Sequence, residues 1–289
     1  ARLLAPIMRE LSETDDVIIA CDRKEVRSMI ENCDGHLPRR ETVWVPRPVG
    51  KGKWRNAWKR SRISKKALKR VSKVVSVGAP IELRSSPKKA RRIYITDTEV
   101  NHLAHSLATP TDIIIPTHFI DSLAGPLMKK KSKIHRIDGL HGHVHLHPHM
   151  RPSSISNPPK VLIRRLLGDG IHDSDEILSI PNDWLEGLDL SYADENEITD
   201  NPWDLTTKIS QMDGVLTQSV TLASEAVLLG VPTLLMSKAR RGFLDRLVDE
   251  GHPLFIAKEI DESILAAWLA GLHLTDALEE PNWPDTKSE

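Results

Sequence analysis

The sequence predicts an α/β fold made of two Rossmann-like domains that face each other across a cleft. Short apolar runs, bounded by charged and turn residues, alternate with segments long enough for crossover helices, which is typical of buried parallel strands. The runs also fall into two series. The first series is DVIIAC (16–21), TVWV (42–45), VVSVG (74–78), RIYIT (92–96), DIIIP (112–116) and KIHRI (133–137). The second is KVLIRRL (160–166), GVLTQS (214–219), PTLLM (232–236) and PLFIA (253–257).

A proline-rich stretch separates the two series, with four prolines in residues 147–160. Because proline fixes its own φ and disfavours a helical predecessor, we expect a linker there. The expected organisation is an N-terminal domain over 1–150, a linker over 151–159 and a C-terminal domain over 160–289. The chain begins without methionine, inside the helix-like stretch ARLLAPIMREL. We therefore expect a first strand and its loop to precede the sequence.

The composition is that of a globular protein with no general affinity for nucleic acid. Of the 289 residues, 39% are hydrophobic and 28% charged, and the formal net charge is zero. A balanced charge provides no overall basic field, so we expect no nucleic-acid partner. The two cysteines, Cys21 and Cys33, give neither a disulfide framework nor a metal-binding pair. No signal peptide and no apolar stretch near the ~20 residues of a membrane span is visible, so we expect a cytoplasmic location.

Charge is nevertheless unevenly distributed along the chain. Basic residues crowd the segment 51–92, in which Glu82 is the single acid. KGKWRNAWKRSRISKKALKRV (51–71) predicts a basic helix in which Trp54 and Trp58 lie one turn apart. Two interpretations stay open. The helix either packs on its domain with a solvated basic face, or it makes a peripheral contact with an anionic membrane.

The sharpest local pattern is TQSVTLASEAVLLGVP, residues 217–232, which predicts a strand end, a hydroxyl-rich turn and a helix. The N–H groups at a helix start, with the hydroxyls of Ser219, Thr221 and Ser224, suit a pyrophosphate. Glu225 lies one turn into the helix, where its carboxylate suits ribose hydroxyls. The alternative is structural, with a hydroxyl capping the helix and Glu225 completing the cap.

The same segment resembles the donor-nucleotide segment of GT-B glycosyltransferases and of the similar UDP-N-acetylglucosamine 2-epimerases, through its strand, its Ser/Thr-rich turn and its EAxxLGxP pattern. The chain resembles more closely the archaeal and bacterial domain of unknown function 354 family, whose members are thought to share this two-domain fold. Four segments carry that resemblance in the expected order: VVSVGAP (74–80), ITDTEVNHLAHSLATPTDIIIPTHF (95–119), DGLHGHVHLHP (138–148) and VLIRRLLGDGIHD (161–173). The resemblance covers nearly the whole chain. It implies a GT-B-like fold, whereas the family itself has no settled reaction.

The resemblance also implies site residues in both domains. Asp97 and Glu99 fall at a strand end on the cleft-facing edge and are candidate catalytic residues, with helix capping as the alternative. Arg164, inside an apolar strand, needs a carboxylate or phosphate partner and is assigned to the nucleotide sugar. Asp169 and His172 follow in a loop that approaches the nucleotide or the sugar. His172 is a candidate base or pyrophosphate ligand, and a surface histidine is the alternative.

Five histidines occupy alternate positions of LHGHVHLHPHM, residues 140–150. If the stretch were extended, all five imidazoles would point to one face. Alternating histidines rarely close a tetrahedral metal site alone, and no cysteine lies nearby. We therefore expect no native metal site and no cofactor besides the nucleotide-sugar substrate. His147 matches the family's Leu-His-Pro motif and is expected at the interdomain hinge, whereas Gly142 replaces the family's usual Glu.

These observations predict a metal-independent, nucleotide-sugar-dependent glycosyltransferase of GT-B type, with an unknown sugar or lipid-linked acceptor bound to the N-terminal domain. Two alternatives stay open. One is a sugar-nucleotide epimerase or hydrolase, which needs no acceptor, and the other is a non-catalytic nucleotide-sugar binding protein of polysaccharide assembly. No Walker A loop, GxSxG elbow, HExxH motif or CxxC pair is present, which argues against the corresponding kinases, hydrolases and zinc proteases.

Overall fold

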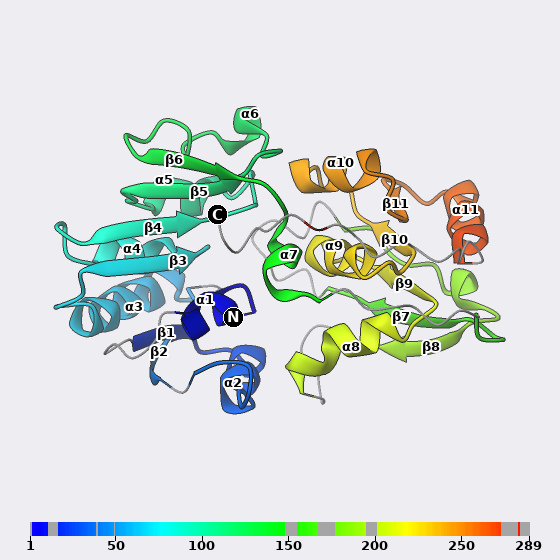
Figure 1. The fold of residues 1–289 in the computed structure, drawn as a ribbon, viewed down its shortest axis with the longest axis horizontal. Coiled ribbons are helices and arrows are strands. Elements are labelled where there is room, and N and C mark those ends of the chain that lie inside the picture. Colours follow the sequence, from blue (N-terminus) through cyan, green and yellow to red (C-terminus); the bar gives the residue numbers. More distant parts are fainter. Residues whose placement is uncertain are drawn as a thin grey trace. The chain divides into compact units, whose positions relative to one another are not determined.

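The structure is a computed structural model that describes residues 2–10, 17–38, 40–48, 50–147, 155–166, 177–194, 201–272 and 283 (Figure 1). Contacts within the chain divide it into two units, of which the first runs to His141 and the second begins at Gly142. Each unit has a parallel sheet of its own. This division lies upstream of the expected linker over 151–159, and the expected domain bounds stay a prediction.

The first unit contains the six strands expected from the first series of runs. Its elements are α1 (Leu4–Glu10), β1 (Val17–Cys21), α2 (Lys24–Glu31), β2 (Glu41–Val45), α3 (Lys53–Ala67), β3 (Lys73–Val77), α4 (Pro80–Ser85), β4 (Arg91–Ile95), α5 (His102–Leu107), β5 (Asp112–Pro116), α6 (Asp121–Ala124) and β6 (Lys133–Ile137). A four-stranded parallel sheet has the order β3-β4-β5-β6, and β1 and β2 form a separate parallel pair.

The core of this unit shows why apolar runs become strands here. β5 lies between β4 and β6, and Ile113 and Ile115 are fully buried in it. Leu83 of α4 and Tyr94 of β4 belong to the same cluster. Burying one such side chain contributes roughly 1.5–3 kcal/mol, so a run of apolar residues between two neighbouring strands is strongly favoured. Truncation of Ile113 to alanine would cost roughly 2–5 kcal/mol.

The second unit contains the four strands of the second series and one further strand. Its elements are β7 (Lys160–Arg164), the 3-10 turns η1 (Asn182–Leu185) and η2 (Pro202–Asp204), β8 (Asp189–Tyr192), α8 (Leu205–Ser210), β9 (Gly214–Thr217), α9 (Val220–Leu228), β10 (Thr233–Met236), α10 (Gly242–Asp249), β11 (Leu254–Ala257) and α11 (Glu262–Leu272). All neighbouring strands are parallel, in the order β11-β10-β9-β7-β8. β8 is the strand that the sequence did not predict.

The strand order of the second unit creates a topological switch point between β7 and β9. From β7 the chain crosses to β8 on one side, and it then returns to form β9 on the other side of β7. The loops that follow β7 and β9 therefore lead in opposite directions from neighbouring strands. In open α/β sheets, ligands bind outside the carboxyl ends of the strands at such a point. Arg164 and Thr217 are register partners at this end of the two strands.

The histidine-rich segment is helical, which corrects the extended conformation considered from the sequence. α7 spans His141–His145, across the division between the two units. Successive side chains of a helix are rotated by about 100°, so alternate histidines do not share one face. Among the helices that the structure describes, none is both long and apolar enough to cross a membrane.

Candidate functional site

Hydrogen bonds around Gln218 join the carboxyl ends of β7 and β9. The Gln218 side chain is buried, its Oε1 accepts the N–H of Leu166 at 2.8 Å, and its Nε2 donates to the carbonyl of Leu178 at 2.6 Å. The backbone N–H of Gln218 and the hydroxyl of Thr217 both donate to the carbonyl of Arg164, at 3.1 and 3.2 Å. The side chain of Gln218 thus ties the start of the loop that follows β7 to the end of β9. Gln218 was not among the expected site residues, because its bonds join it to segments 52 and 40 positions away in the chain.

The hydroxyl-rich turn leads into α9, and two of its three hydroxyls bond within the helix. Ser219 is the N-cap, and its Oγ accepts the N–H of Leu222 at 3.3 Å. The Oγ of Ser224 donates to the carbonyl of Thr221 at 2.9 Å. Thr221 itself is exposed in the first turn. The structural alternative for Ser219 is therefore what the structure shows, and an N-cap of this kind is worth about 1 kcal/mol.

Glu225 forms a buried pair with a histidine of α7. Oε1 of Glu225 lies 3.2 Å from Nε2 of His145, and the two side chains are 8% and 6% exposed. In the extended conformation considered from the sequence, His145 would point to the same face as the other alternate histidines. The helical conformation of α7 instead turns this imidazole toward α9, and the contact holds the Glu225 carboxylate in a defined orientation.

Gly142 permits the close approach of α7 to α9. A Cβ atom at this position would lie 2.5 Å from Cδ1 of Leu228 and 3.1 Å from Cδ1 of Leu146. Any larger residue would force these buried leucines to move. The absence of a side chain at Gly142 therefore lets the two helices come together.

The structure describes two of the four remaining residues that the sequence singled out, namely Arg164 and His147. Arg164 is the last residue of β7 and half-buried, and its Nη1 donates to the carbonyl of Ala193 at 3.0 Å. The carbonyl of Ala193 is thus one partner of Arg164, and the expected phosphate partner stays a prediction. Asp169 and His172 lie outside the described residues. His147 is exposed, two residues after the end of α7.

The segment after β10 adds two buried polar residues that the sequence analysis did not select. Ser237 and Arg241 are 2% and 4% exposed. Oγ of Ser237 accepts the N–H of Ala239 at 3.1 Å, and Nη1 of Arg241 donates to the carbonyl of Arg240 at 2.9 Å. A guanidinium this deeply buried places a positive charge beyond the carboxyl end of a third strand. Nothing in the pattern MSKARRG distinguishes Arg241 from its exposed neighbour Arg240.

In the first unit, Asp97 follows β4 and contacts two side chains. Nδ1 of His141 lies 3.4 Å from its Oδ2, and the hydroxyl of Thr98 donates to its Oδ1 at 3.2 Å. Burial tends to raise the pKa of the Asp97 carboxyl, but the contact with His141 and the hydrogen bonds lower it below its ordinary value. Asp97 is therefore ionised at neutral pH, and its side chain is about a third exposed.

Glu99 is fully buried, which differs from its expected place at an accessible edge. Its Oε1 accepts the N–H of Ile120 at 3.2 Å, so it joins the loop after β4 to the start of α6. The capping alternative considered for Asp97 and Glu99 is wrong, because α5 begins at His102. Its N-cap is Asn101, whose side chain accepts the N–H of Ala104 at 3.3 Å.

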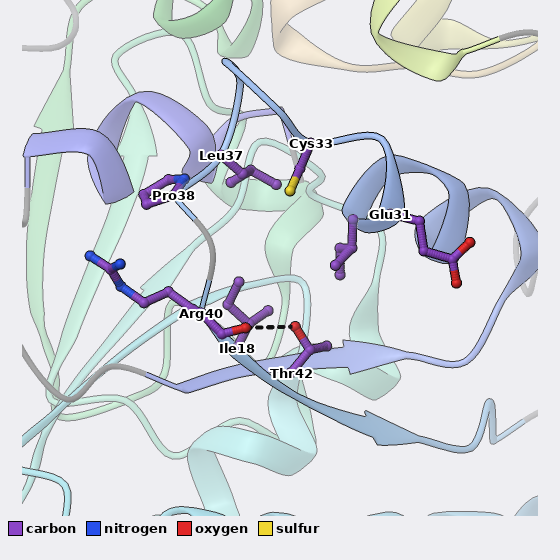
Figure 2. Close-up of a pocket in the computed structure, with 8 residues that line it drawn as sticks. Ile18, Glu31, Cys33, Leu37, Pro38, Arg40 and Thr42 are labelled. Atoms are coloured by element: carbon purple, nitrogen blue, oxygen red, sulfur yellow. Dashed lines mark hydrogen bonds between the residues drawn. The ribbon is translucent and has the colours of Figure 1, made fainter.

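Within the described ranges, no group of three or more His, Cys, Asp or Glu side chains is placed to hold a metal ion. Figure 2 shows a pocket of the first unit, whose lining includes Ile18, Cys33, Leu37 and Arg40. The carbonyl of Arg40 accepts the hydroxyl of Thr42 at 3.4 Å. Ile18 and Thr42 are register partners near the amino ends of β1 and β2. The pocket is thus at the end of these strands opposite to the one at which α/β sheets bind ligands.

Comparison with solved structures shows the same fold in nucleotide-sugar epimerases. UDP-GlcNAc 2-epimerase from Methanocaldococcus jannaschii matches with a TM-score of 0.58 and 12% identity, over 99% of this chain and 92% of that one. The S. aureus MnaA–UDP complex matches with 0.57 and 12%, over 95% and 85%. A Listeria monocytogenes protein assigned as a UDP-N-acetylglucosamine 2-epimerase matches with 0.61 and 9%, over 94% and 83%.

At these identities the likeness shows the fold alone, which is a GT-B-like α/β fold with two parallel-sheet units. The expected fold class is thereby confirmed. No family model matches the chain, and neither does any curated protein. Membership of the domain of unknown function 354 family therefore stays a prediction, as does a strand preceding residue 1.

Proposed function

We propose that this protein binds a nucleotide sugar at the carboxyl ends of β7 and β9 and transfers the sugar to an acceptor, as a glycosyltransferase of GT-B type. The observation that carries the proposal is the register pair of Arg164 and Thr217, which lies at the switch point of the second sheet and directly before the start of α9. This is the position at which the strand order itself predicts a ligand. One of the solved structures that share the fold is described as a complex with UDP, which supports the choice of ligand class.

The pyrophosphate would bind between the first turn of α9, whose N–H groups carry partial positive charge, and the positively charged side chain of Arg164. The first-turn N–H groups of α9 and the exposed hydroxyl of Thr221 are hydrogen-bond donors, and the guanidinium of Arg164 supplies charge. Donors that are already fixed stabilise the departing diphosphate without reorganisation, and one such donor is worth roughly 10²–10³-fold in rate. Gln218 fixes these groups relative to one another through its bonds to the loop after β7. In this scheme the protein stabilises the leaving group without a metal.

The ribose would be recognised by Glu225 together with His145. A carboxylate accepts hydrogen bonds from two vicinal hydroxyls, and the 3.2 Å contact with the imidazole limits the orientations that the carboxylate can adopt. Both side chains are buried, so they are shielded from competing water. We assign His145 as a positioning residue for Glu225.

On the acceptor side, we assign the base to the pair of His141 and Asp97. The ionised Asp97 carboxylate contacts Nδ1 of His141 and orients the ring, and in this proposal Nε2 takes a proton from an acceptor hydroxyl. Such a base contributes roughly 10²–10⁴-fold, so its loss reduces turnover without removing nucleotide binding. Glu99 is a structural residue in this proposal, because it is fully buried and bonded to the Ile120 backbone.

A second candidate function is the epimerisation of a UDP-sugar, which is favoured by the fold shared with two structures described as UDP-N-acetylglucosamine 2-epimerases. The two reactions differ in their need for an acceptor. Incubation with UDP-N-acetylglucosamine and other UDP-sugars, followed by NMR of the products, separates them. A new sugar epimer formed without acceptor identifies the epimerase, and UDP released only with an acceptor mixture identifies the transferase. UDP released from the donor alone identifies a hydrolase, and binding without turnover identifies a nucleotide-sugar binding protein.

The same assay tests the assigned site through matched variants. Thr221→Ala and Arg164→Gln are expected to lower turnover at least tenfold, since each removes a group that faces the pyrophosphate. Thr207→Ala is the control, because Thr207 is likewise an exposed helical threonine of the second unit but lies on α8. Equal turnover of all three variants and the unaltered protein would place the reaction elsewhere.

A further inference from the structure

We infer that the exposed face of α3 docks on a lipid bilayer rich in anionic lipids. The surface in question consists of the side chains of α3 that point away from the first unit. This inference goes beyond the proposed function and does not depend on it, because a protein with any activity on nucleotide sugars could be held at a membrane in this way.

Two tryptophans form the apolar part of the surface. Trp54 and Trp58 are 74% and 62% exposed, the highest values among the exposed large hydrophobic side chains. They are four residues apart, so they lie on the same face of the helix. Both indoles stay largely in water after folding, so their burial contributes little to the free energy of unfolding of the first unit. A tryptophan ring is favoured at the boundary between lipid headgroups and hydrocarbon, where its apolar body and polar N–H are both satisfied.

Cations surround the two tryptophans. The guanidinium of Arg62 lies 4.8 Å from the centroid of the Trp58 ring, and Nζ of Lys53 lies 5.8 Å from that of Trp54. The exposed basic residues of the helix and its flanks are Lys51, Lys53, Arg55, Lys59, Arg62, Lys65, Lys66, Lys69 and Arg70. Each cation held near an anionic bilayer strengthens binding by about fivefold, so a cluster of this size suffices for charge-driven recruitment.

No acid of this segment offsets the positive charge at the surface. Glu82 is the single acid between residues 51 and 92, and it is 5% exposed. Its two carboxylate oxygens accept from Arg60 at 2.6 and 3.1 Å, and the hydroxyl of Ser64 adds a contact at 3.4 Å. The carboxylate of Glu82 is therefore paired on the inner side of α3, and every exposed charged residue of segment 51–70 is basic.

The inner side also fixes which face of α3 points outward. Ser64 is fully buried, and Leu68, directly after the helix, joins the core of the first unit. The hydroxyl of Ser61 lies 3.1 Å from that of Ser85 on α4. These contacts, with the Arg60–Glu82 pair, set the rotation of the helix about its axis. Trp54 and Trp58 are thus presented outward by a rigid support.

A bilayer fits this surface better than a nucleic acid does. Proteins that stack bases on aromatic rings line a basic groove with them, whereas Trp54 and Trp58 protrude from one exposed helix. A basic helix carrying tryptophans is the form in which peripheral proteins bind anionic membranes.

The test is sedimentation of the full chain with vesicles of phosphatidylcholine, with or without phosphatidylglycerol, at low and high salt. We expect binding to the phosphatidylglycerol vesicles, weakened by salt, with little binding to phosphatidylcholine alone. Trp54→Ala combined with Trp58→Ala should weaken binding at least tenfold. Leu103→Ala combined with Val248→Ala is the control, because these side chains are also exposed and apolar but lie on α5 and α10.

A second variant tests the charge. Lys59→Glu combined with Lys66→Glu should abolish binding to the anionic vesicles, with an unchanged melting temperature showing that the first unit is folded. The inference is overturned if the protein binds neither kind of vesicle, binds both equally, or binds anionic vesicles without needing the tryptophans. It is also overturned if the tryptophans are required for binding an oligonucleotide and vesicles are not bound.

Discussion

The hydroxyl of Thr217 donates to the carbonyl oxygen of Arg164 at 3.2 Å, between residues that are 53 positions apart in the sequence. The two residues are register partners of β7 and β9, and the chain leaves them in opposite directions. Their proximity therefore results from strand order, because β8 is formed on the far side of β7. The proposed nucleotide site depends on this relationship.

Gln218→Ala is expected to lower the free energy of unfolding by roughly 1–3 kcal/mol, since it leaves the N–H of Leu166 and the carbonyl of Leu178, both in half-buried residues, without the partner that Gln218 supplies. Urea denaturation measures the change. Gln211→Ala is the matched control, because Gln211 is exposed at the end of α8 and should change stability by less than about 0.5 kcal/mol. Equal effects of the two substitutions would mean that the Gln218 bonds do not hold the loop after β7.

His145→Phe and Glu225→Gln are each expected to destabilise the protein, and the double variant should be less destabilised than the sum of the two. Groups in direct contact show coupling energies of roughly 0.5–3 kcal/mol in a double-mutant cycle, and the 3.2 Å contact is buried on both sides. Denaturation of the four proteins measures the cycle. Strictly additive losses would show that the two side chains do not interact in solution.

Gly142→Ala is expected to destabilise the protein by roughly 1–3 kcal/mol, because the added methyl group would overlap Cδ1 of Leu228. Since the overlap is with a side-chain end, Leu228→Ala should partly relieve it. The cost of Gly142→Ala is then smaller in the Leu228→Ala background than in the unaltered protein. Thermal denaturation of the single and double variants checks this, and a stabilising effect of Gly142→Ala alone would refute the close approach of α7 and α9.

Stability is expected to fall as the pH is lowered below the ordinary histidine pKa of about 6.5. Burial lowers the pKa of the fully buried His105, and the carbonyl of Ala124 only partly offsets this effect. The unfolded chain therefore binds a proton at a pH where the folded chain does not. The stabilisation is complete above about pH 6.5 and is lost as the pH falls toward the lowered pKa.

Urea denaturation from about pH 8 to about pH 5 measures this dependence. His105→Gln should flatten the curve in the acid range relative to the curve of the unaltered protein. An unaltered acid slope in His105→Gln would show that other groups cause the loss of stability.

The interior of both sheets could be predicted from the sequence because buried parallel strands are apolar on both faces. GVLT, TLLM and DIIIP, which become the central strands β9, β10 and β5, need no partner to be recognised as strands. β8 has the sequence DLSY and was missed, since an edge strand pairs on one side only and tolerates polar residues. The turn that precedes α9 was also predictable from the sequence, because a Ser at the N-cap is a local signal for a helix start.

The conformation of α7 and the contacts of the site could not be predicted in this way. HGHVH alternates in the manner of a strand, yet the segment is helical, with Gly142 against Leu228 and His145 against Glu225. These contacts join residues that are about 80 positions apart in the chain, so a local pattern does not contain them. Gln218 was missed for the same reason, because its role consists of bonds to two other loops.

The most direct test of the nucleotide site is calorimetric titration with UDP, GDP, CDP, TDP and ADP in the presence of EDTA. We expect micromolar binding of one of these nucleotides, unaffected by the chelator. Arg164→Gln and Thr221→Ala should each weaken that binding about tenfold or more, and Thr207→Ala should not. Absence of binding by all five nucleotides, binding that requires a metal, or binding that is unchanged in Arg164→Gln would contradict a nucleotide site at the carboxyl ends of β7 and β9.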